Sequence, residues 1–366
     1  MKVTVLGSGA GALTVAADLS RHGRDVVIAD LPKFAENLAP IREQGGVRVV
    51  SGARPIDPVT VVDDLGAATS EAELLIVVVP SFGHEPWLTA LLAHVRSGQS
   101  LLFMGEGSGA LVARPVLVAN GKGDVVLGET NTLPYVARLA GPGAVSADRK
   151  SGGTYLAGLP SASAHSLLSG IGDVWPYMTA AESVWETVLI NYNAIDHVAT
   201  ILSNAGTIEN RTGGMLLWGE GATPSVVRVI ESVDGELLAI RKTLGLSNLN
   251  RYRDLLIQQG FATDVGPSLY EVLRASRLVT SYFPTGPDGL QTRYLTEDVP
   301  YALVLASSIA REVGTPTPVI DALIAIASAM HGREFRAEGR TLAKVGLEGT
   351  GLTGLIDFAE TGILPR

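Results

Sequence analysis

MKVTVLGSGAGALTVAADLSRHGRDVVIAD, residues 1 to 30, has the pattern of a strand, a glycine-rich turn, a helix and a second strand that ends in an acid. The run Val3 to Leu6 is apolar and rich in β-branched residues, which is typical of a strand buried on both faces. It leads into Gly7, Gly9 and Ala12, which have the GxGxxA spacing of a dinucleotide-binding turn. The chain is therefore predicted to begin with a dinucleotide-binding unit.

There is a physical reason for each of the small residues in this turn. Gly7 allows the tight turn, Gly9 lacks a Cβ and lets the backbone approach a pyrophosphate, and Ala12 lets the helix pack closely on the strand. The free backbone N–H groups and the positive dipole end of the helix favour an anion at its start. We therefore expect a dinucleotide to contact Gly7, Ser8, Gly9, Ala10, Gly11 and Ala12.

Asp30 indicates which dinucleotide is bound. It follows the strand Asp25 to Ala29 and stands 23 residues after Gly7. A carboxylate at this position accepts hydrogen bonds from the adenosine ribose hydroxyls and repels a 2′-phosphate. The preferred cofactor is therefore predicted to be NAD(H). Lys33 lies close in sequence and weakens the exclusion of a phosphate, so NADP(H) stays open.

Composition bounds the class of protein. The chain has 366 residues, 46% of them hydrophobic, and no cysteine. This length suffices for about two domains with substantial cores, and without cysteine the chain offers no disulfide and no thiolate metal site. Its 37 acidic and 28 basic residues are scattered along the chain, which disfavours nucleic-acid binding. We expect no metal, no signal peptide, no membrane span and a cytoplasmic location.

Strand-like segments alternate with helix-like segments after Asp30, which is the rhythm of a doubly wound sheet. Apolar runs over 74–79, 100–104 and 124–127 each lead into a polar or glycine-rich loop. Loops at the carboxyl ends of parallel strands line the cofactor crevice of such sheets. Pro80, which ends the first of these runs, is therefore a candidate cofactor-binding residue.

The pattern changes near residue 181. Strand-length apolar runs give way to long amphipathic stretches such as Glu182 to Ala205, Ser225 to Leu244 and Pro318 to His331. These stretches predict helices. We therefore predict an α/β, Rossmann-type doubly wound N-terminal domain over residues 1–180, an all-α C-terminal domain over 181–366, and an active site between the two.

Two segments of the second half carry candidate chemistry. In NYNAIDHVATILSNAG, Asn193 and His197 are four residues apart and share one helix face. In RYLTEDVPYALV, Asp298 stands at a predicted loop-to-helix transition. A carboxylate bonded to one imidazole nitrogen fixes the tautomer and makes the other nitrogen a proton-transfer group. A satisfied polar pair in a helical core is the alternative interpretation of Asn193 and His197.

The chain resembles the opine dehydrogenases of the octopine and nopaline type. The resemblance spans essentially the full length and rests on four motifs in this order: GSGAGA with its acid, GETNTLPY, NAIDH and RYLTEDVP. It implies NAD(P)H-dependent reductive condensation of an amino acid with an α-keto acid. It also implies that His197 is the acid/base, that Asp298 orients it, and that Glu129 and Thr130 lie beside the nicotinamide ribose. Asn193 would then bind a substrate carboxylate or carbonyl.

Other functions stay open at this point. Ketopantoate reductases and 2-hydroxy acid reductases join a similar dinucleotide domain to a helical one, and a non-catalytic NAD(H)-binding redox sensor would need only the first domain. Exposed apolar helices in the second half suggest a homodimer. Two substrate carboxylates need cations, and charge alone does not choose among Arg211, Arg228, Arg251 and Arg293.

Overall fold

A computed structural model describes residues 1–50, 55–211, 214–264, 266–279 and 286–365. The chain forms two compact units. The first unit comprises Met1–Lys150, Thr154–Thr187 and Ala359–Ile363, and the second comprises Ser151–Gly153, Val188–Phe358 and Leu364–Arg366. Each unit therefore includes short segments from elsewhere in the chain, which the continuous ranges 1–180 and 181–366 do not provide for.

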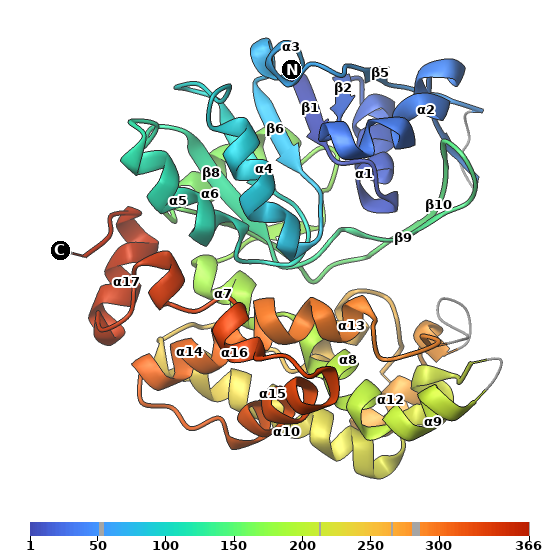
Figure 1. Ribbon diagram of the computed structural model, residues 1–366, viewed down its shortest axis with the longest axis vertical. Helices are drawn as coiled ribbons and strands as arrows, with labels where there is room; N and C mark the ends of the chain where they lie inside the picture. The colour runs from blue at the N-terminus through green and yellow to red at the C-terminus, as the bar shows by residue number, and fades with distance from the viewer. Residues whose placement is uncertain (51–54, 212–213, 265, 280–285, 366) are drawn as a thin grey trace. The chain divides into compact units, whose positions relative to one another are not determined.

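The first unit is built on an eight-stranded sheet of order β12-β11-β8-β7-β6-β1-β2-β5 (Figure 1). Every neighbouring pair is parallel except β11 with β8. The strand order reverses at β1, which lies between β2 and β6, so the doubly wound α/β fold predicted from the sequence is confirmed. The strands are β1 (Lys2–Leu6), β2 (Asp25–Ala29), β5 (Thr60–Val61), β6 (Leu74–Val77), β7 (Ser100–Phe103), β8 (Val126–Thr130), β11 (Thr154–Gly158) and β12 (Met178–Ala180).

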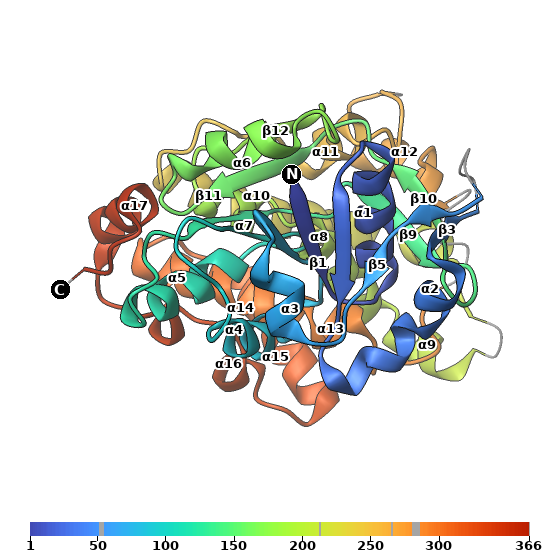
Figure 2. The same ribbon diagram turned by 90° about the horizontal axis from the view of Figure 1, so that it is seen from above.

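Helices connect these strands, and α1 packs against β1 and β2 (Figure 2). The helix predicted over Pro32 to Gln44 is instead a 3-10 helix followed by a short α-helix. The helices of this unit are α1 (Ala10–Arg21), η1 (Pro32–Leu38), α2 (Ala39–Gln44), α3 (Leu65–Ser70), η2 (Ser81–Gly83), α4 (His84–Leu91), α5 (Gly109–Ala119) and α6 (Ser163–Ile171). Two more, α7 (Val184–Leu189) and α17 (Gly351–Thr361), contain residues of both units.

A second sheet of order β4-β3-β10-β9 packs against α1. Its strands are β3 (Gly46–Val49), β4 (Asp57–Pro58), β9 (Tyr135–Leu139) and β10 (Ala144–Arg149). Strands β9 and β10 form an antiparallel hairpin, whereas β10 pairs with β3 across about a hundred residues of chain. The sequence patterns described above do not predict this sheet, and the pairing of β10 with β3, which joins its two halves, is long-range.

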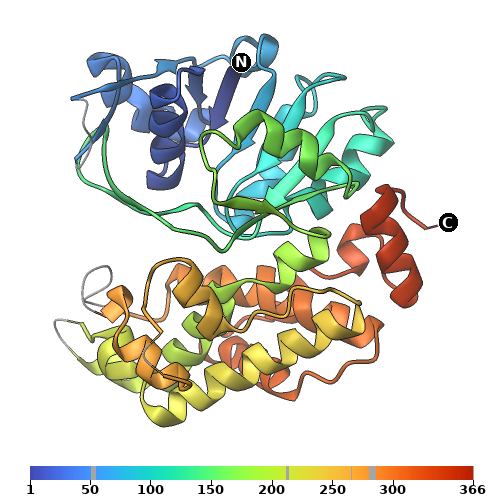
Figure 3. The same ribbon diagram turned by 180° about the vertical axis from the view of Figure 1, so that it is seen from behind.

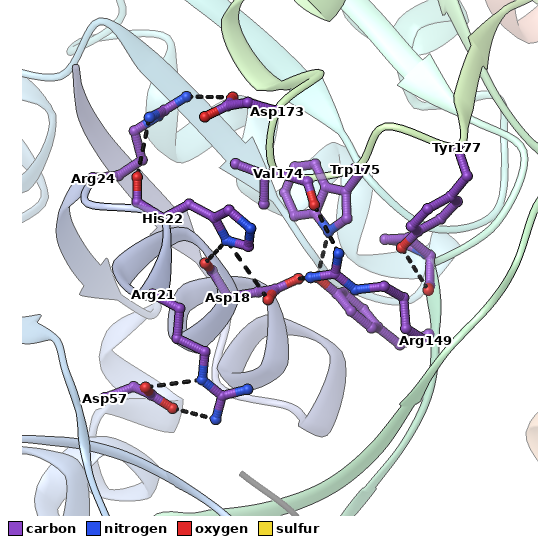
Figure 4. A network of polar contacts seen from close by, with 12 residues as sticks. Asp18, Arg21, His22, Arg24, Asp57, Arg149, Asp173, Val174, Trp175 and Tyr177 are labelled. Carbon is purple, nitrogen blue, oxygen red and sulfur yellow. Dashed lines mark hydrogen bonds and ion pairs between the residues drawn. The ribbon is translucent and has the colours of Figure 1, made fainter. Parts of the chain in front are cut away.

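Buried ion pairs fasten the second sheet to α1 (Figure 4). Asp18 of α1 is buried and accepts hydrogen bonds from the Tyr135 hydroxyl of β9 and the Arg149 guanidinium of β10. Arg21 binds the fully buried Asp57 of β4 with two hydrogen bonds, of 2.9 and 2.5 Å. These contacts fix the helix whose first turn carries the dinucleotide-binding pattern.

The second unit is built from helices and loops and has no strand among its described residues (Figure 3). Helix α8 lies at its centre and packs against α10, α13, η3, η5 and α15. Its helices are α8 (Tyr192–Ser203), α9 (Ala205–Asn210), η3 (Leu217–Gly221), α10 (Pro224–Thr243), α11 (Tyr252–Gln258), α12 (Leu269–Arg274), α13 (Arg293–Thr296), η5 (Asp298–Leu303), α14 (Val304–Glu312), α15 (Pro318–His331), α16 (Phe335–Glu338) and η6 (Ala343–Val345). The predicted all-α second half is confirmed.

Local capping explains where the two main helices of this unit begin. The Asn191 side chain accepts a hydrogen bond from the Ala194 N–H and caps α8, and the Thr223 side chain caps α10 by accepting from Val226. Pro224 occupies the first turn of α10, where its missing N–H costs no hydrogen bond. No helix in the described ranges has both the length and the hydropathy needed to cross a membrane.

We expect Asp18→Ala to lower the free energy of unfolding by about 2–3 kcal/mol, because it removes the acceptor shared by Arg149 and the buried Tyr135 hydroxyl. Urea unfolding followed by circular dichroism measures this. The control is Asp173→Ala, since Asp173 pairs with Arg24 at 2.5 Å but has a side chain that is 56% exposed. It should cost less than about 1 kcal/mol. Equal losses in the two variants would contradict the structural importance given to Asp18.

Candidate active site

The turn between β1 and α1 requires its first glycine. Gly7 has a φ of +124°, and a Cβ at this position would lie 2.6 Å from the Val78 carbonyl oxygen. The Gly7 N–H also donates to the Ala29 carbonyl of β2 at 2.9 Å. No residue with a side chain fits here without moving β6 or the turn.

Gly9 has a different reason to be glycine. It is the N-cap of α1 and has extended backbone, and a Cβ built on it meets nothing within 4 Å. Open space therefore lies in front of the helix start, where the first N–H groups have no partner within the helix. A phosphate can approach this backbone as the sequence predicts. Gly11, by contrast, faces Leu133, whose Cδ1 would be 2.8 Å from an added Cβ.

Asp30 directly follows β2 and is held in place by two donors. Its Oδ2 accepts from the Ser8 hydroxyl at 2.5 Å and its Oδ1 accepts from the Leu31 N–H at 2.7 Å. Burial raises the pKa of this carboxyl, although these two hydrogen bonds and the nearby Lys33 oppose the rise. Each carboxylate oxygen has a second lone pair, so Asp30 can also accept from ribose hydroxyls.

Strand β8 runs further than predicted, because its pairing with β11 extends through Thr130. Glu129 and Thr130 are therefore buried strand residues. Glu129 accepts hydrogen bonds from the Ala110 N–H at 2.9 Å and the Thr187 hydroxyl at 2.7 Å. Thr130 accepts from the Gly105 N–H at 3.1 Å. Both side chains fix the loops after β7 and β8, and their predicted contact with a cofactor stays a prediction.

Pro80 follows β6 by three residues and is the N-cap of η2. It is half-buried and has extended backbone, with φ −58° and ψ 156°. The strand itself ends at Val77, so Pro80 takes no part in the hydrogen bonds of the sheet. The structure thus places it in a strand-end loop, and its contact with a cofactor also stays a prediction.

Lys150 is a buried base that the sequence did not single out. It follows β10, and its Nζ donates to the Thr132 hydroxyl in the loop after β8 at 2.8 Å. Burial lowers the pKa of Lys150 from 10.5 to about 7. The folded chain therefore holds a neutral amine in a pH range where the unfolded chain binds a proton.

This difference predicts a pH-dependent stability. At a pH between the folded and unfolded pKa values of Lys150, the unfolded state binds more protons than the folded state. As the pH rises through this range, the free energy of unfolding of the wild type should therefore increase by about 1.4 kcal/mol per pH unit relative to that of Lys150→Met. The gain should be absent well below pH 7, where both states are protonated. Urea unfolding of both proteins from about pH 6 to pH 9.5 measures it. A difference that does not change with pH would mean that Lys150 stays charged in the folded protein.

His197 and Asp298 are 101 residues apart in sequence, and the fold of the second unit brings them into contact. His197 lies on α8 and Asp298 is the first residue of η5. The distance between His197 Nδ1 and Asp298 Oδ2 is 2.7 Å, and the two side chains are 12% and 3% exposed. We assign the Nδ1–H to the bond with the carboxylate, which leaves Nε2 for proton transfer.

Three residues that the sequence did not reveal surround this imidazole. The rings of Tyr294 and Trp218 lie 4.2 and 5.9 Å from the His197 ring, between centroids. The Asp196 Oδ1 lies 3.8 Å from His197 Nε2. Asp196 is adjacent to His197 in sequence, and this neighbouring acid is the sequence signal that could have identified it as a site residue. Tyr294 and Trp218 come from α13 and η3, and no local pattern places them here.

Asn193 lies one turn before His197 on α8 and is half-buried. The cap of this helix is Asn191, two residues earlier, and not Asn193. The substrate contact predicted for Asn193 stays a prediction.

The four candidate arginines are in different surroundings. Arg251 pairs with the buried Asp234, Arg211 pairs with Glu220 at 2.6 Å, and Arg228 donates to the Ser225 hydroxyl. Arg293 pairs with Glu297 at 2.7 Å and has a side chain that is 65% exposed. It directly precedes Tyr294, whose ring contacts His197, which makes it the candidate on the same segment as the His197–Asp298 pair. Within the described chain, no cluster of three or more histidine or acidic residues could hold a metal ion.

Two family models match different parts of the chain. The family model for NAD/NADP octopine/nopaline dehydrogenase, alpha-helical domain, matches residues 180–331. The family model for ketopantoate reductase PanE/ApbA matches residues 3–159. An opine dehydrogenase from Arthrobacter sp. (strain 1C) is 33% identical over 363 residues, which cover 97% of this chain and 98% of that protein.

Solved structures share the fold over nearly the whole chain. Octopine dehydrogenase with NADH and L-arginine has a TM-score of 0.81 at 20% identity, over 100% of this chain and 99% of that one. Yersinopine dehydrogenase with NADP+ has a TM-score of 0.71 at 15% identity, over 98% of each chain.

Proposed function

Because this chain belongs to the opine dehydrogenase family, we propose that it reductively condenses the amine of an amino acid with an α-keto acid, using NAD(P)H. The observation that carries the proposal is the hydrogen bond of 2.7 Å between His197 and Asp298. Asp298 orients the imidazole, and His197 Nε2 serves as the proton-transfer atom.

The residues of the first unit fit a dinucleotide. Gly7 permits the turn, Gly9 leaves open space before the helix start, and Asp30 offers acceptors after β2. We propose NAD(H) as the preferred cofactor and NADP(H) as an alternative, since related solved structures are described with NADH and with NADP+. When bound, the reduced nicotinamide supplies the hydride of the reaction.

The proton steps fall to His197. The free amine adds to the keto carbon, and its proton passes to the former keto oxygen. The protonated His197 Nε2 then donates a second proton to this oxygen, which leaves as water while the nitrogen forms a cationic imine. Hydride addition to the imine carbon gives the neutral secondary amine. One proton and one hydride are thus consumed for each water released, and His197 is reprotonated from solvent.

We also propose that Arg293 binds a substrate carboxylate. Its side chain is 65% exposed, and it precedes Tyr294 on α13, the short helix that leads into η5 and Asp298. A guanidinium matches a carboxylate in shape and charge. Asn193, one helical turn from His197, is proposed to donate a hydrogen bond to a substrate carboxylate or carbonyl. The predicted homodimer and the cytoplasmic location stay proposals.

A substrate panel tests the reaction class. Pyruvate, 2-oxoglutarate and oxaloacetate are each combined with the standard amino acids, and NADH and NADPH consumption is followed. We expect rapid oxidation only when both an amino acid and a keto acid are present. Oxidation with a keto acid alone would instead identify a 2-hydroxy acid or ketopantoate reductase. Binding of NADH without turnover of any pair would favour the redox-sensor alternative.

The role of His197 is tested on the active pair. His197→Ala should lower kcat by about 10²- to 10⁴-fold, the usual contribution of a general acid, and should leave NADH binding unchanged. His165→Ala, at an exposed position of α6, serves as the control. Full turnover in His197→Ala would refute the assignment of the proton donor.

A further inference from the structure

A second carboxylate faces the imidazole of His197. Asp298 Oδ2 lies 2.7 Å from Nδ1, and Asp196 Oδ1 lies 3.8 Å from Nε2, the nitrogen assigned to proton transfer. Each ring nitrogen therefore has an acidic group within ion-pair distance. The proposed reaction uses Asp298 to orient the ring and so far gives Asp196 no part.

Asp196 is held firmly from two other helices. Its Oδ2 accepts from the Trp218 indole N–H of η3 at 2.6 Å and from the Tyr252 hydroxyl of α11 at 2.7 Å. Its side chain is 5% exposed. The two donors on Oδ2 turn the other oxygen, Oδ1, toward His197.

These two hydrogen bonds do not by themselves require a charge. The carbonyl of an asparagine would accept from the same indole and hydroxyl groups. Burial disfavours the ionised carboxyl and raises the pKa of Asp196, whereas the nearby His197 lowers it. A buried carboxylate is costly unless a positive charge compensates it, and the positive charge at hand is a protonated His197.

We propose that Asp196 acts through His197 as a positioning residue: its carboxylate favours the imidazolium and so extends toward alkaline pH the range in which His197 can donate a proton. An opposite charge close to a titrating group favours the charged form of that group. The inference rests on the proposed function, in which His197 donates a proton to the oxygen that leaves as water.

The reaction itself explains why this range matters. An amine attacks a carbonyl only as the free base, which accumulates toward alkaline pH. The proton donor must stay protonated at that same pH. A single imidazole with an ordinary pKa near 6.5 meets the second demand poorly. Two carboxylates beside one imidazole let both demands hold at once.

Tyr252 and Asp234, which lie close to Asp196, do not supply a positive charge that would compensate its carboxylate. Burial and the Asp196 charge raise the pKa of Tyr252 well above its usual value, so it stays a neutral donor. Asp234 accepts from the Tyr252 N–H and pairs with Arg251. Among the described residues, the titratable groups that contact Asp196 or His197 from the packed elements include Asp298 on η5, Tyr294 on α13 and Tyr252 on α11, with Asp234 on α10 behind Tyr252.

The test compares Asp196→Asn with Tyr252→Phe. The first variant removes the charge but keeps an oxygen acceptor, and the second removes one anchor but keeps the charge. The titration of His197 is followed by NMR of the protein carrying ¹³C-labelled histidine, with His197→Gln to assign the signal. The pH dependence of kcat for condensation is measured in parallel.

We expect Asp196→Asn to move the His197 titration, and the alkaline limit of kcat, to lower pH by about one unit or more. Tyr252→Phe should leave both near the wild-type values. If Asp196→Asn does not fold, as judged by circular dichroism, Asp196→Ser also removes the charge and takes its place.

The possible failures are distinguishable. An unchanged His197 titration in the variant that lacks the charge overturns the inference, and so does an equal shift in Tyr252→Phe, which would indicate a packing effect. A shifted titration in a protein that condenses no substrate pair supports the electrostatic role of Asp196 and contradicts the proposed function.

Discussion

The hydrogen bond between His197 and Asp298 is the constraint on which the candidate site depends. Its two atoms lie 2.7 Å apart although the residues are 101 positions apart in sequence. The bond forms only because η5 packs against α8, so that the first residue of η5 meets the second turn of the central helix. Both side chains are largely buried, and a carboxylate buried in this way needs a partner. The packing of the second unit and the orientation of the imidazole are therefore linked.

The first unit meets a different demand, since a phosphate needs open backbone and a rigid helix behind it. Gly7 adopts the positive φ that the turn requires, and Gly9 leaves the helix start accessible. The helix itself is clamped from the other end, where Asp18 and Arg21 bind the second sheet. The contacts that hold α1 in place therefore lie in its C-terminal half, away from the helix start where an anion would bind. The hydride donor and the proton donor of the proposed reaction are provided by separate units, each with its own core.

Local patterns in the sequence predicted the β1–α1–β2 arrangement, the three apolar strands at 74–79, 100–104 and 124–127, and the helical character of the second half, because alternation and helical periodicity are properties of neighbouring residues. The extension of β8 through Thr130 and the sheet that packs on α1 depend on partners far along the chain, and no local pattern encodes them. The same holds for the site. His197 and Asp298 could be singled out by residue type, whereas Tyr294, Trp218 and Lys150 take their positions from packing. Asp196 is adjacent to His197 in sequence but is not among the predicted site residues.

The central claim is that His197 Nε2 is the proton donor to the oxygen of the keto substrate. A crystal structure of the protein with the reduced cofactor and its α-keto acid tests this most directly. The account predicts that the keto oxygen lies within about 3.2 Å of His197 Nε2, with Nδ1 still bonded to Asp298. A keto oxygen bound by another side chain, with His197 out of reach, would contradict it.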